Sequence, residues 1–221
     1  MTTMPKKKGG RATVSDRPLE CATAGDWHAW LAQHHAASSG VWLLIAKQGG
    51  GRKTPTYAEA VDGALTWGWI DSQKQKHDDT AWLQRFTPRK PRSPWSRINR
   101  GKATALIASR KMEAPGLAEV ERARRDGRWR AAYDSARSAK VPADLAAALA
   151  ANKRAASFFA DIDAANRYAI LWRLQTAKKP ETRARRLARF VARLARHERI
   201  HALPERTSRE GTKRRSPRRK G

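Results

Sequence analysis

Four tryptophans lie in the segment from Trp67 to Asn99. Tryptophan is large, and it is usually buried and hydrogen-bonded, so such a cluster requires a dense core or an aromatic-lined pocket. The same segment carries charged side chains, among them Asp71 and Arg89. The sequence therefore predicts a folded region in which charged groups lie beside buried rings.

The chain has 221 residues, of which 40% are hydrophobic, and this suits one domain or two small ones. Its single cysteine, Cys21, cannot form an internal disulfide, which fits a reducing compartment. The N-terminal residues lack the apolar stretch of a secretion signal, and the longest apolar runs are too short to cross a bilayer. We therefore expect a soluble, cytoplasmic protein that does not span a membrane.

The formal net charge is +27, and part of it lies in the two ends of the chain. Residues 1–14 and 204–221 are short, polar and strongly basic, so we expect disordered tails there. A field of this sign attracts polyanions such as nucleic acid, and the tails are candidates for non-specific binding. The alternative is that the charge only reflects a composition rich in arginine and alanine.

The spacing of apolar residues predicts a predominantly helical α+β fold. Helices packed on a small antiparallel sheet should form an N-terminal domain over residues 15–137, followed by a helical C-terminal domain over residues 138–203. Expected strands are 40–46, 69–75 and 80–87. Expected helices are 26–36, 56–67, 93–111, 117–126, 129–136, 142–151, 153–160, 163–177 and 180–201.

The last predicted helix contains His197-Glu-Arg-Ile-His201, which fits the zinc motif H-E-x-x-H. The surrounding arginines disfavour a divalent cation, and both histidines would continue the apolar stripe of the helix. We therefore interpret His197 and His201 as packing residues, and we expect neither a metal site nor a cofactor.

The best candidate site is the basic, proline-rich segment that ends at Asn99. We expect Ser93-Pro94 to begin a helix, because serine is a good N-cap and proline suits the first turn. A helix N-terminus behind basic side chains favours an anion. The candidate ligand-binding residues, for an unknown anionic or aromatic molecule, are Trp67, Trp69, Asp71, Arg89, Lys90, Ser93, Trp95, Ser96 and Asn99.

A structural interpretation of the same residues stays open. Ser93 would then only cap a helix and Trp95 would only pack. Asp71 would form an ion pair with Arg85 or Arg89, since a buried carboxylate needs a partner.

Several segments resemble the YdeI/OmpD-associated family, also called the bacteriocin-protection family. They are 40–43 (GVWL), 57–61 (YAEAV), 64–72 (ALTWGWIDS), 86–90 (FTPRK), 126–129 (DGRW), 141–145 (VPADL) and 177–183 (AKKPETR). The resemblance covers nearly everything between about residues 20 and 200 in order, with Trp67 as one departure from the usual pattern. It implies protection against antimicrobial peptides and association with a porin, and it supplies no catalytic residue or cofactor.

Three functional hypotheses follow. The first is a non-enzymatic protein that binds a small ligand or a protein partner in envelope stress or bacteriocin protection. The second is a nucleic-acid-binding protein that uses the basic tails and the arginine-rich C-terminal helix. The third is an enzyme of unknown reaction whose site lies around Asp71 and residues 89–99.

Overall fold

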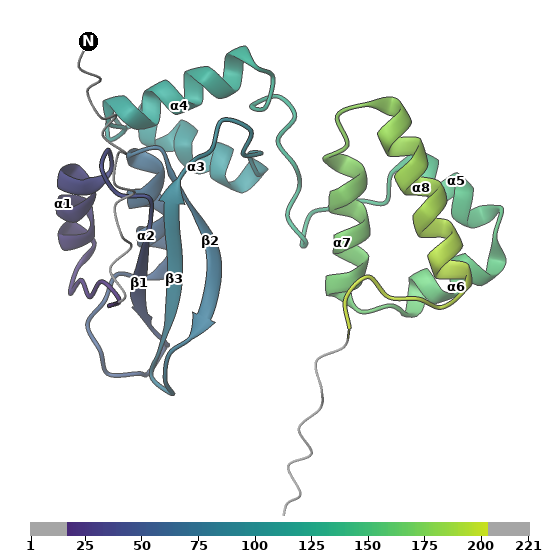
Figure 1. Ribbon diagram of the computed structural model, residues 1–221, viewed down its shortest axis with the longest axis horizontal. Helices are drawn as coiled ribbons and strands as arrows, with labels where there is room; N and C mark the ends of the chain where they lie inside the picture. The colour runs from purple at the N-terminus through teal and green to yellow at the C-terminus, as the bar shows by residue number, and fades with distance from the viewer. Residues whose placement is uncertain (1–16, 203–221) are drawn as a thin grey trace, which may run out of the picture. The chain divides into compact units, whose positions relative to one another are not determined.

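The computed structural model describes residues 17–202, and the predicted tails lie outside this range (Figure 1). The chain divides into two compact units, Met1–Ala139 and Lys140–Gly221. This division falls close to the change from mixed to purely helical sequence near residue 138.

The N-terminal unit is α+β and the C-terminal unit is helical, as predicted. The first contains α1 (Ala24–His34), β1 (Val41–Ala46), α2 (Tyr57–Thr66), β2 (Trp69–Lys76), β3 (Ala81–Pro88), α3 (Arg97–Ala108) and α4 (Ala114–Arg125). The second contains α5 (Ala143–Ala150), α6 (Lys153–Asp161), α7 (Ala164–Gln175) and α8 (Pro180–Ala195).

The three strands form an antiparallel sheet in the order β1-β3-β2. β2 and β3, which match the expected strands 69–75 and 80–87, form a hairpin. Asp78 fixes its turn by accepting hydrogen bonds from the backbone N–H groups of Thr80 (2.7 Å) and Ala81 (2.8 Å). The register places Trp69 opposite Pro88, so the start of β2 and the end of β3 meet at one end of the sheet.

The core of the N-terminal unit lies between the sheet and its helices, with α2 behind the strands in Figure 1 and α1 beside it. Trp27 of α1 is fully buried, and its indole N–H donates to the Ala60 carbonyl of α2 at 3.0 Å. Trp69, Phe86 and Trp95 are also almost fully buried. The tryptophan-rich segment therefore contributes mainly to a dense core.

Two helix starts show how local capping works here. α2, which matches the expected helix over residues 56–67, begins with a capping box in which Thr56 and Glu59 exchange side-chain and backbone hydrogen bonds. α1 also begins with a capping box, but its N-cap is Thr23, and Asp26 is the third helical residue. The helix therefore begins two residues before the expected start at residue 26.

α3 begins at Arg97 with Ser96 as N-cap, so the prediction of a helix from Ser93-Pro94 was wrong. The N–H of Tyr133 donates to the Trp95 carbonyl at 2.9 Å, and the N–H of Arg97 donates to the Tyr133 carbonyl at 2.8 Å. This pairing holds the chain before Arg97 extended. It also prevents the helix predicted over residues 129–136, because Tyr133 takes part in the pairing.

α8 ends at Ala195, before the histidine motif. His197 adopts a left-handed φ of 60°, and the N–H groups of His197 and Glu198 bond back to Leu194 and Arg193 in a Schellman turn. The His197 ring stacks on Phe158 at 4.9 Å, consistent with a packing role. Because the turn breaks the motif, its residues do not share one helical face.

The segment after this turn is held against α7. The buried Asn166 accepts the backbone N–H groups of Ile200 (2.8 Å) and His201 (2.7 Å) through its side-chain oxygen. His201 is exposed, so the prediction that it packs on the helical stripe was wrong. Among residues 17–202, no helix has the length and apolar character needed to span a membrane.

Candidate functional site

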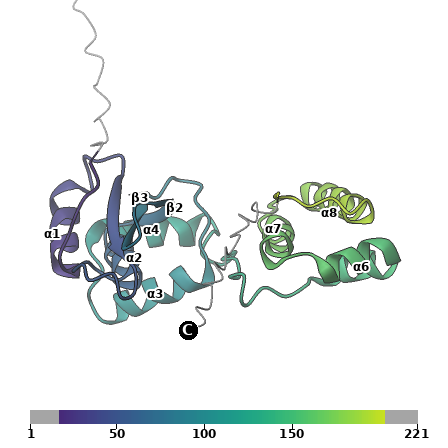
Figure 2. The ribbon, with the colours of Figure 1, turned by 90° about the horizontal axis from the view of Figure 1, so that it is seen from below.

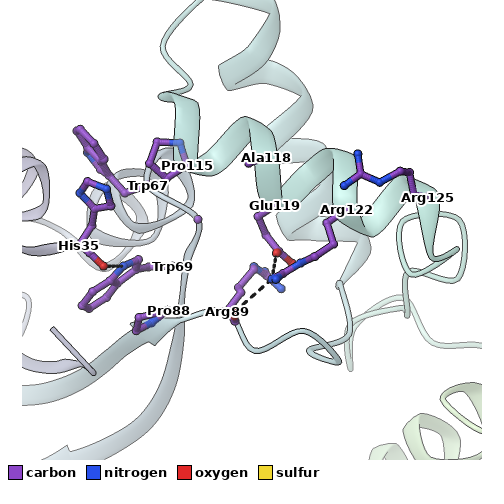
Figure 3. Close-up of a pocket in the computed structure, with 11 residues that line it drawn as sticks. His35, Trp67, Trp69, Pro88, Arg89, Pro115, Ala118, Glu119, Arg122 and Arg125 are labelled. Atoms are coloured by element: carbon purple, nitrogen blue, oxygen red, sulfur yellow. Dashed lines mark hydrogen bonds and ion pairs between the residues drawn. The ribbon is translucent and has the colours of Figure 1, made fainter. Parts of the chain in front are cut away.

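A cavity of about 400 Å³ lies in the N-terminal unit, beside the end of the sheet where β2 begins and β3 ends (Figure 3). We call it the Trp67–Arg89 cavity. It is lined by His35, Trp67, Gly68, Trp69, Pro88, Arg89, Pro115, Ala118, Glu119, Arg122 and Arg125.

The aromatic side of the cavity depends on the turn between α2 and β2. Gly68 adopts a φ of 73°, and a Cβ on it would lie 3.0 Å from the Pro115 carbonyl oxygen, so glycine suits this turn. The turn places Trp67 against the ring of His35, with centroids 4.5 Å apart. The Trp69 indole N–H donates to the His35 carbonyl at 3.2 Å. The end of α1 and the turn therefore form one aromatic wall.

The polar side comes from α4, whose buried stripe includes Glu119, only 5% exposed. One Glu119 carboxylate oxygen accepts from Arg128 Nη1 at 2.9 Å, and the other accepts from Arg122 Nη2. Arg128 is also bound by Asp126, with Nε to Oδ2 at 2.7 Å. Glu119 is thus already engaged by two guanidinium groups.

Arg89 follows β3 and is the third arginine near this carboxylate. It is 6% exposed, its guanidinium carbon lies 3.8 Å from the centroid of the Trp95 ring, and its Nη1 donates to the Pro94 carbonyl at 3.2 Å. Burial lowers the pKa of Arg89 from its ordinary value of 12.5 to about 10, and the nearby charge of Glu119 only partly opposes this. Arg89 is therefore a buried cation with incomplete compensation.

The cavity lining has a surplus of hydrogen-bond donors. Arg89 Nε and Nη2, Arg122 Nε and the Trp67 indole nitrogen are buried, and none has a hydrogen-bond partner among the described residues. Three arginines line the cavity against one carboxylate. Arginine and indole N–H groups only donate, so a molecule that satisfies them must supply acceptor atoms.

The structure brings only some of the predicted site residues together. Trp67, Trp69 and Arg89 line the cavity. Trp95 lies under Arg89, where its 2% exposure keeps it in the core.

Four other predicted residues do not line this cavity. Lys90 is exposed, and its backbone N–H donates to the Ser93 hydroxyl at 3.1 Å. Ser96 caps α3 by accepting the Asn99 N–H at 3.1 Å. Their positions follow from the later start of α3, because the helix N-terminus is not at Ser93.

Asp71 also lies outside the lining. It accepts a hydrogen bond from the Tyr57 hydroxyl at 2.6 Å. Burial and this hydrogen bond raise the pKa of Tyr57. Within residues 17–202, Asp71 forms no ion pair with Arg85 or Arg89, so the expected pair is not present, although its charge acts to raise the pKa of Arg89.

Sequence reasoning missed His35, Glu119 and Arg122. One signal could have found Glu119: it lies on the same helical stripe as Gly116, Val120 and Ala123. A carboxylate in a stripe of small and apolar residues is expected to be buried and paired. No comparable signal marks His35, which contributes through its position at the end of α1.

The fold and the cavity define a two-unit α+β protein whose N-terminal unit has a cationic, aromatic-walled cavity. Residues 138–197 match the family described as "Bacteriocin-protection, YdeI or OmpD-Associated". Residues 19–119 match a domain of unknown function, DUF8412. The C-terminal part of the chain is therefore similar to the bacteriocin-protection, YdeI or OmpD-associated family over these residues. Comparisons with curated proteins and with solved structures found no match.

These matches refine the resemblance noted in the sequence. The segments around Trp67 and Arg89 fall within the domain of unknown function, whereas residues 141–145 and 177–183 fall within the bacteriocin-protection match. Most of the cavity lining thus belongs to the domain of unknown function, with Arg122 and Arg125 just beyond it.

Proposed function

We propose that the N-terminal unit binds a small anionic ligand with an aromatic or planar part in the Trp67–Arg89 cavity. The observation that carries this proposal is Arg89, a cation that is 6% exposed, lines the cavity and has two unpaired guanidinium nitrogens. An uncompensated buried charge is costly, and a bound carboxylate or phosphate would supply the missing acceptors.

The two walls suggest how the ligand lies. Its anionic group would contact Arg89 and Arg122, which Figure 3 shows close together below α4. Its ring would lie toward Trp67 and Trp69 on the other side of the cavity. A volume of about 400 Å³ is within the range of small-molecule sites.

The lining supports binding rather than catalysis. It contains no serine, threonine, cysteine or lysine, and the Nδ1 atom of its histidine, His35, is hydrogen-bonded to the Leu31 carbonyl at 2.9 Å. Its one carboxylate, Glu119, already accepts from two arginines. Of the residues in the enzymatic hypothesis, Arg89 lines the cavity, whereas Asp71, Ser96 and Asn99 do not.

Titration calorimetry with phenyl phosphate, benzoate and neutral benzamide tests the proposal. We expect the two anions to bind and benzamide not to bind. Arg89→Met should abolish binding, whereas Arg92→Met, which removes an exposed charge from the same loop, should preserve it. Equal binding of benzamide and benzoate, or unchanged binding to Arg89→Met, would contradict an anion site at Arg89.

We further propose that this binding serves the role in the family description, bacteriocin protection, from within the cytoplasm. The family description of residues 138–197 supports the role, and the buried free thiol of Cys21 fits a reducing compartment. Survival of bacteria exposed to a bacteriocin, with wild-type or Arg89→Met protein expressed, tests the link. Equal survival with the two proteins would show that ligand binding in the cavity is not needed for protection against the bacteriocin.

A further inference from the structure

The C-terminal unit contains a second cavity, which lies between α7 and α8 and has a volume of about 420 Å³. The two helices run side by side in Figures 1 and 2. We call this the arginine groove. It is lined by Trp172, Arg173, Thr176, Arg186, Arg189, Phe190, Arg193 and Ile200.

The helical repeat places the arginines on one side of the groove. Arg186, Arg189 and Arg193 are spaced at i, i+3 and i+7 along α8, so they share a face. Arg173 faces them from the last turn of α7. The amphipathic stripe of α8 buries Phe190 and Leu194 in the core, which fixes the direction in which the basic face points.

Backbone carbonyls orient two of these guanidinium groups. Arg186 Nη1 donates to the Arg173 carbonyl at 2.6 Å, and Arg173 Nη1 donates to the Ala169 carbonyl at 3.0 Å. Carbonyl acceptors fix the geometry of a guanidinium without neutralising its charge. The groove is therefore preorganised and still positive.

Carboxylates contribute little to the groove. None lines it, and the nearest ion pair joins Arg193 Nε to Glu198 at 3.4 Å. Arg189 is exposed and has no ion pair or hydrogen bond with the described residues. The groove therefore carries four arginines with one nearby carboxylate.

The aromatic residues of the lining indicate which class of anion the groove binds. Trp172 and Phe190 give the groove an aromatic part, and Trp172 is half-buried. Aromatic rings beside phosphate-binding cations are the usual platform for unstacked bases, which single strands offer and duplexes do not. A formal net charge of +27 adds a general attraction for a polyanion.

We infer that the arginine groove binds single-stranded nucleic acid, with its arginines on the phosphates and a base against Trp172. This inference concerns the C-terminal unit and does not depend on the ligand proposed for the Trp67–Arg89 cavity.

Fluorescence anisotropy of the full chain with a labelled oligothymidylate tests the charge contacts. The variant Arg173→Ala/Arg189→Ala should weaken binding roughly tenfold or more and reduce the salt slope of log K by about 1.4, since each lost phosphate contact contributes about 0.7. The matched control is Arg154→Ala/Arg185→Ala, which removes two exposed charges of the same unit that do not line the groove. Equal losses of oligothymidylate affinity in the two double variants would overturn the inference. Binding would then depend on the overall positive charge of the unit and not on the arginines of the groove.

The variant Trp172→Leu tests whether a base stacks against Trp172. It should weaken oligothymidylate binding roughly fivefold or more while leaving inorganic polyphosphate, which has no bases, unchanged. Trp172→Phe should restore most of the affinity because it keeps a ring, and thermal melts check that each variant is folded. Equal losses for both polymers would overturn the stacking contact. Preferential binding to phosphatidylglycerol vesicles, lost in Arg173→Ala/Arg189→Ala while oligothymidylate binding persists, would show that the groove takes a lipid headgroup instead.

Discussion

The guanidinium carbon of Arg89 lies 3.8 Å from the centroid of the Trp95 ring, in the core of the N-terminal unit. This contact compensates part of the cost of burying a cation. No carboxylate accepts a hydrogen bond from Arg89 within residues 17–202, and its pKa is lowered to about 10 by burial. Arg89 is therefore positioned by packing but is poorly compensated electrostatically.

Arg89→Met should separate stability from binding. The change removes a buried, incompletely compensated charge and also a cation–π contact and one hydrogen bond, so the opposing effects nearly cancel. We expect the free energy of unfolding to change by no more than about 1–2 kcal/mol, in either direction. Urea denaturation measures it. A loss above about 3 kcal/mol would instead make Arg89 a structural residue.

Glu119→Gln should be strongly destabilising, because it leaves Arg122 and the 6%-exposed Arg128 without their shared carboxylate. Breaking a buried pair in this way costs roughly 3–5 kcal/mol. Glu121→Gln is the matched control on the same helix, where the exposed pair with Arg125 spans 4.0 Å and should contribute at most about 1 kcal/mol. Thermal melts of both variants compare the stability that each carboxylate contributes. Similar losses of stability would mean that the buried ion pairs of Glu119 contribute no more than the exposed pair of Glu121.

Ser96→Ala should lower the free energy of unfolding by about 1 kcal/mol, because Ser96 accepts the Asn99 N–H and caps α3. Ser93→Ala should leave the helix content unchanged, because the Ser93 hydroxyl accepts from Lys90 in the preceding turn. Chemical denaturation followed by circular dichroism measures both effects. A larger loss of helix content in Ser93→Ala than in Ser96→Ala would show that the helix begins at Ser93-Pro94, as predicted from the sequence.

Asp78 should make the hairpin sensitive to acid. Its hydrogen bonds from Thr80, with smaller contributions from Ala81 and Arg52, lower the pKa of Asp78 from 3.8 to about 2. A lowered carboxyl pKa contributes stability that is fully present above about pH 4 and is lost as the pH falls through about 2. Asp78→Asn should therefore be less stable than wild type at pH 7, and the difference should shrink over this window.

Urea denaturation at several pH values tests this dependence. Asp79→Asn is the control, because the side chain of Asp79 is 98% exposed and its ion pair with Lys76 is long, at 3.7 Å. A difference between Asp78→Asn and wild type that stays constant from neutral to acidic pH would show that hydrogen bonding to the charged form is not the cause.

Local features of the fold were predictable from the sequence. The hairpin around Asp78 follows from two short runs joined by a polar turn, and α2 follows from the capping box of Thr56 and Glu59. Both depend on residues a few positions apart. The start of α3 was not predictable in this way, because Tyr133 holds the chain at Trp95 extended from a distant part of the sequence.

In the candidate site, too, some residues are positioned by local sequence and others by distant packing. The hairpin register brings Trp69 beside Pro88 and so places Arg89 near Trp67, two residues predicted from the sequence to share one candidate site. The packing of α4 against the turn at Gly68 then supplies Glu119 and Arg122, which no local pattern links to Arg89.

The sequence by itself determined the class of fold, the hairpin, most helices, the tryptophan-rich core and the similarity of the C-terminal unit to the bacteriocin-protection family. Periodicity, capping and turn chemistry act between near neighbours, so these features can be read along the chain. Only the tertiary structure decided which charges are buried together. The pairing of Glu119 with Arg122 and Arg128, and the lack of such a partner for Arg89, depend on helix packing across the sheet end, where burial makes each unpaired charge costly.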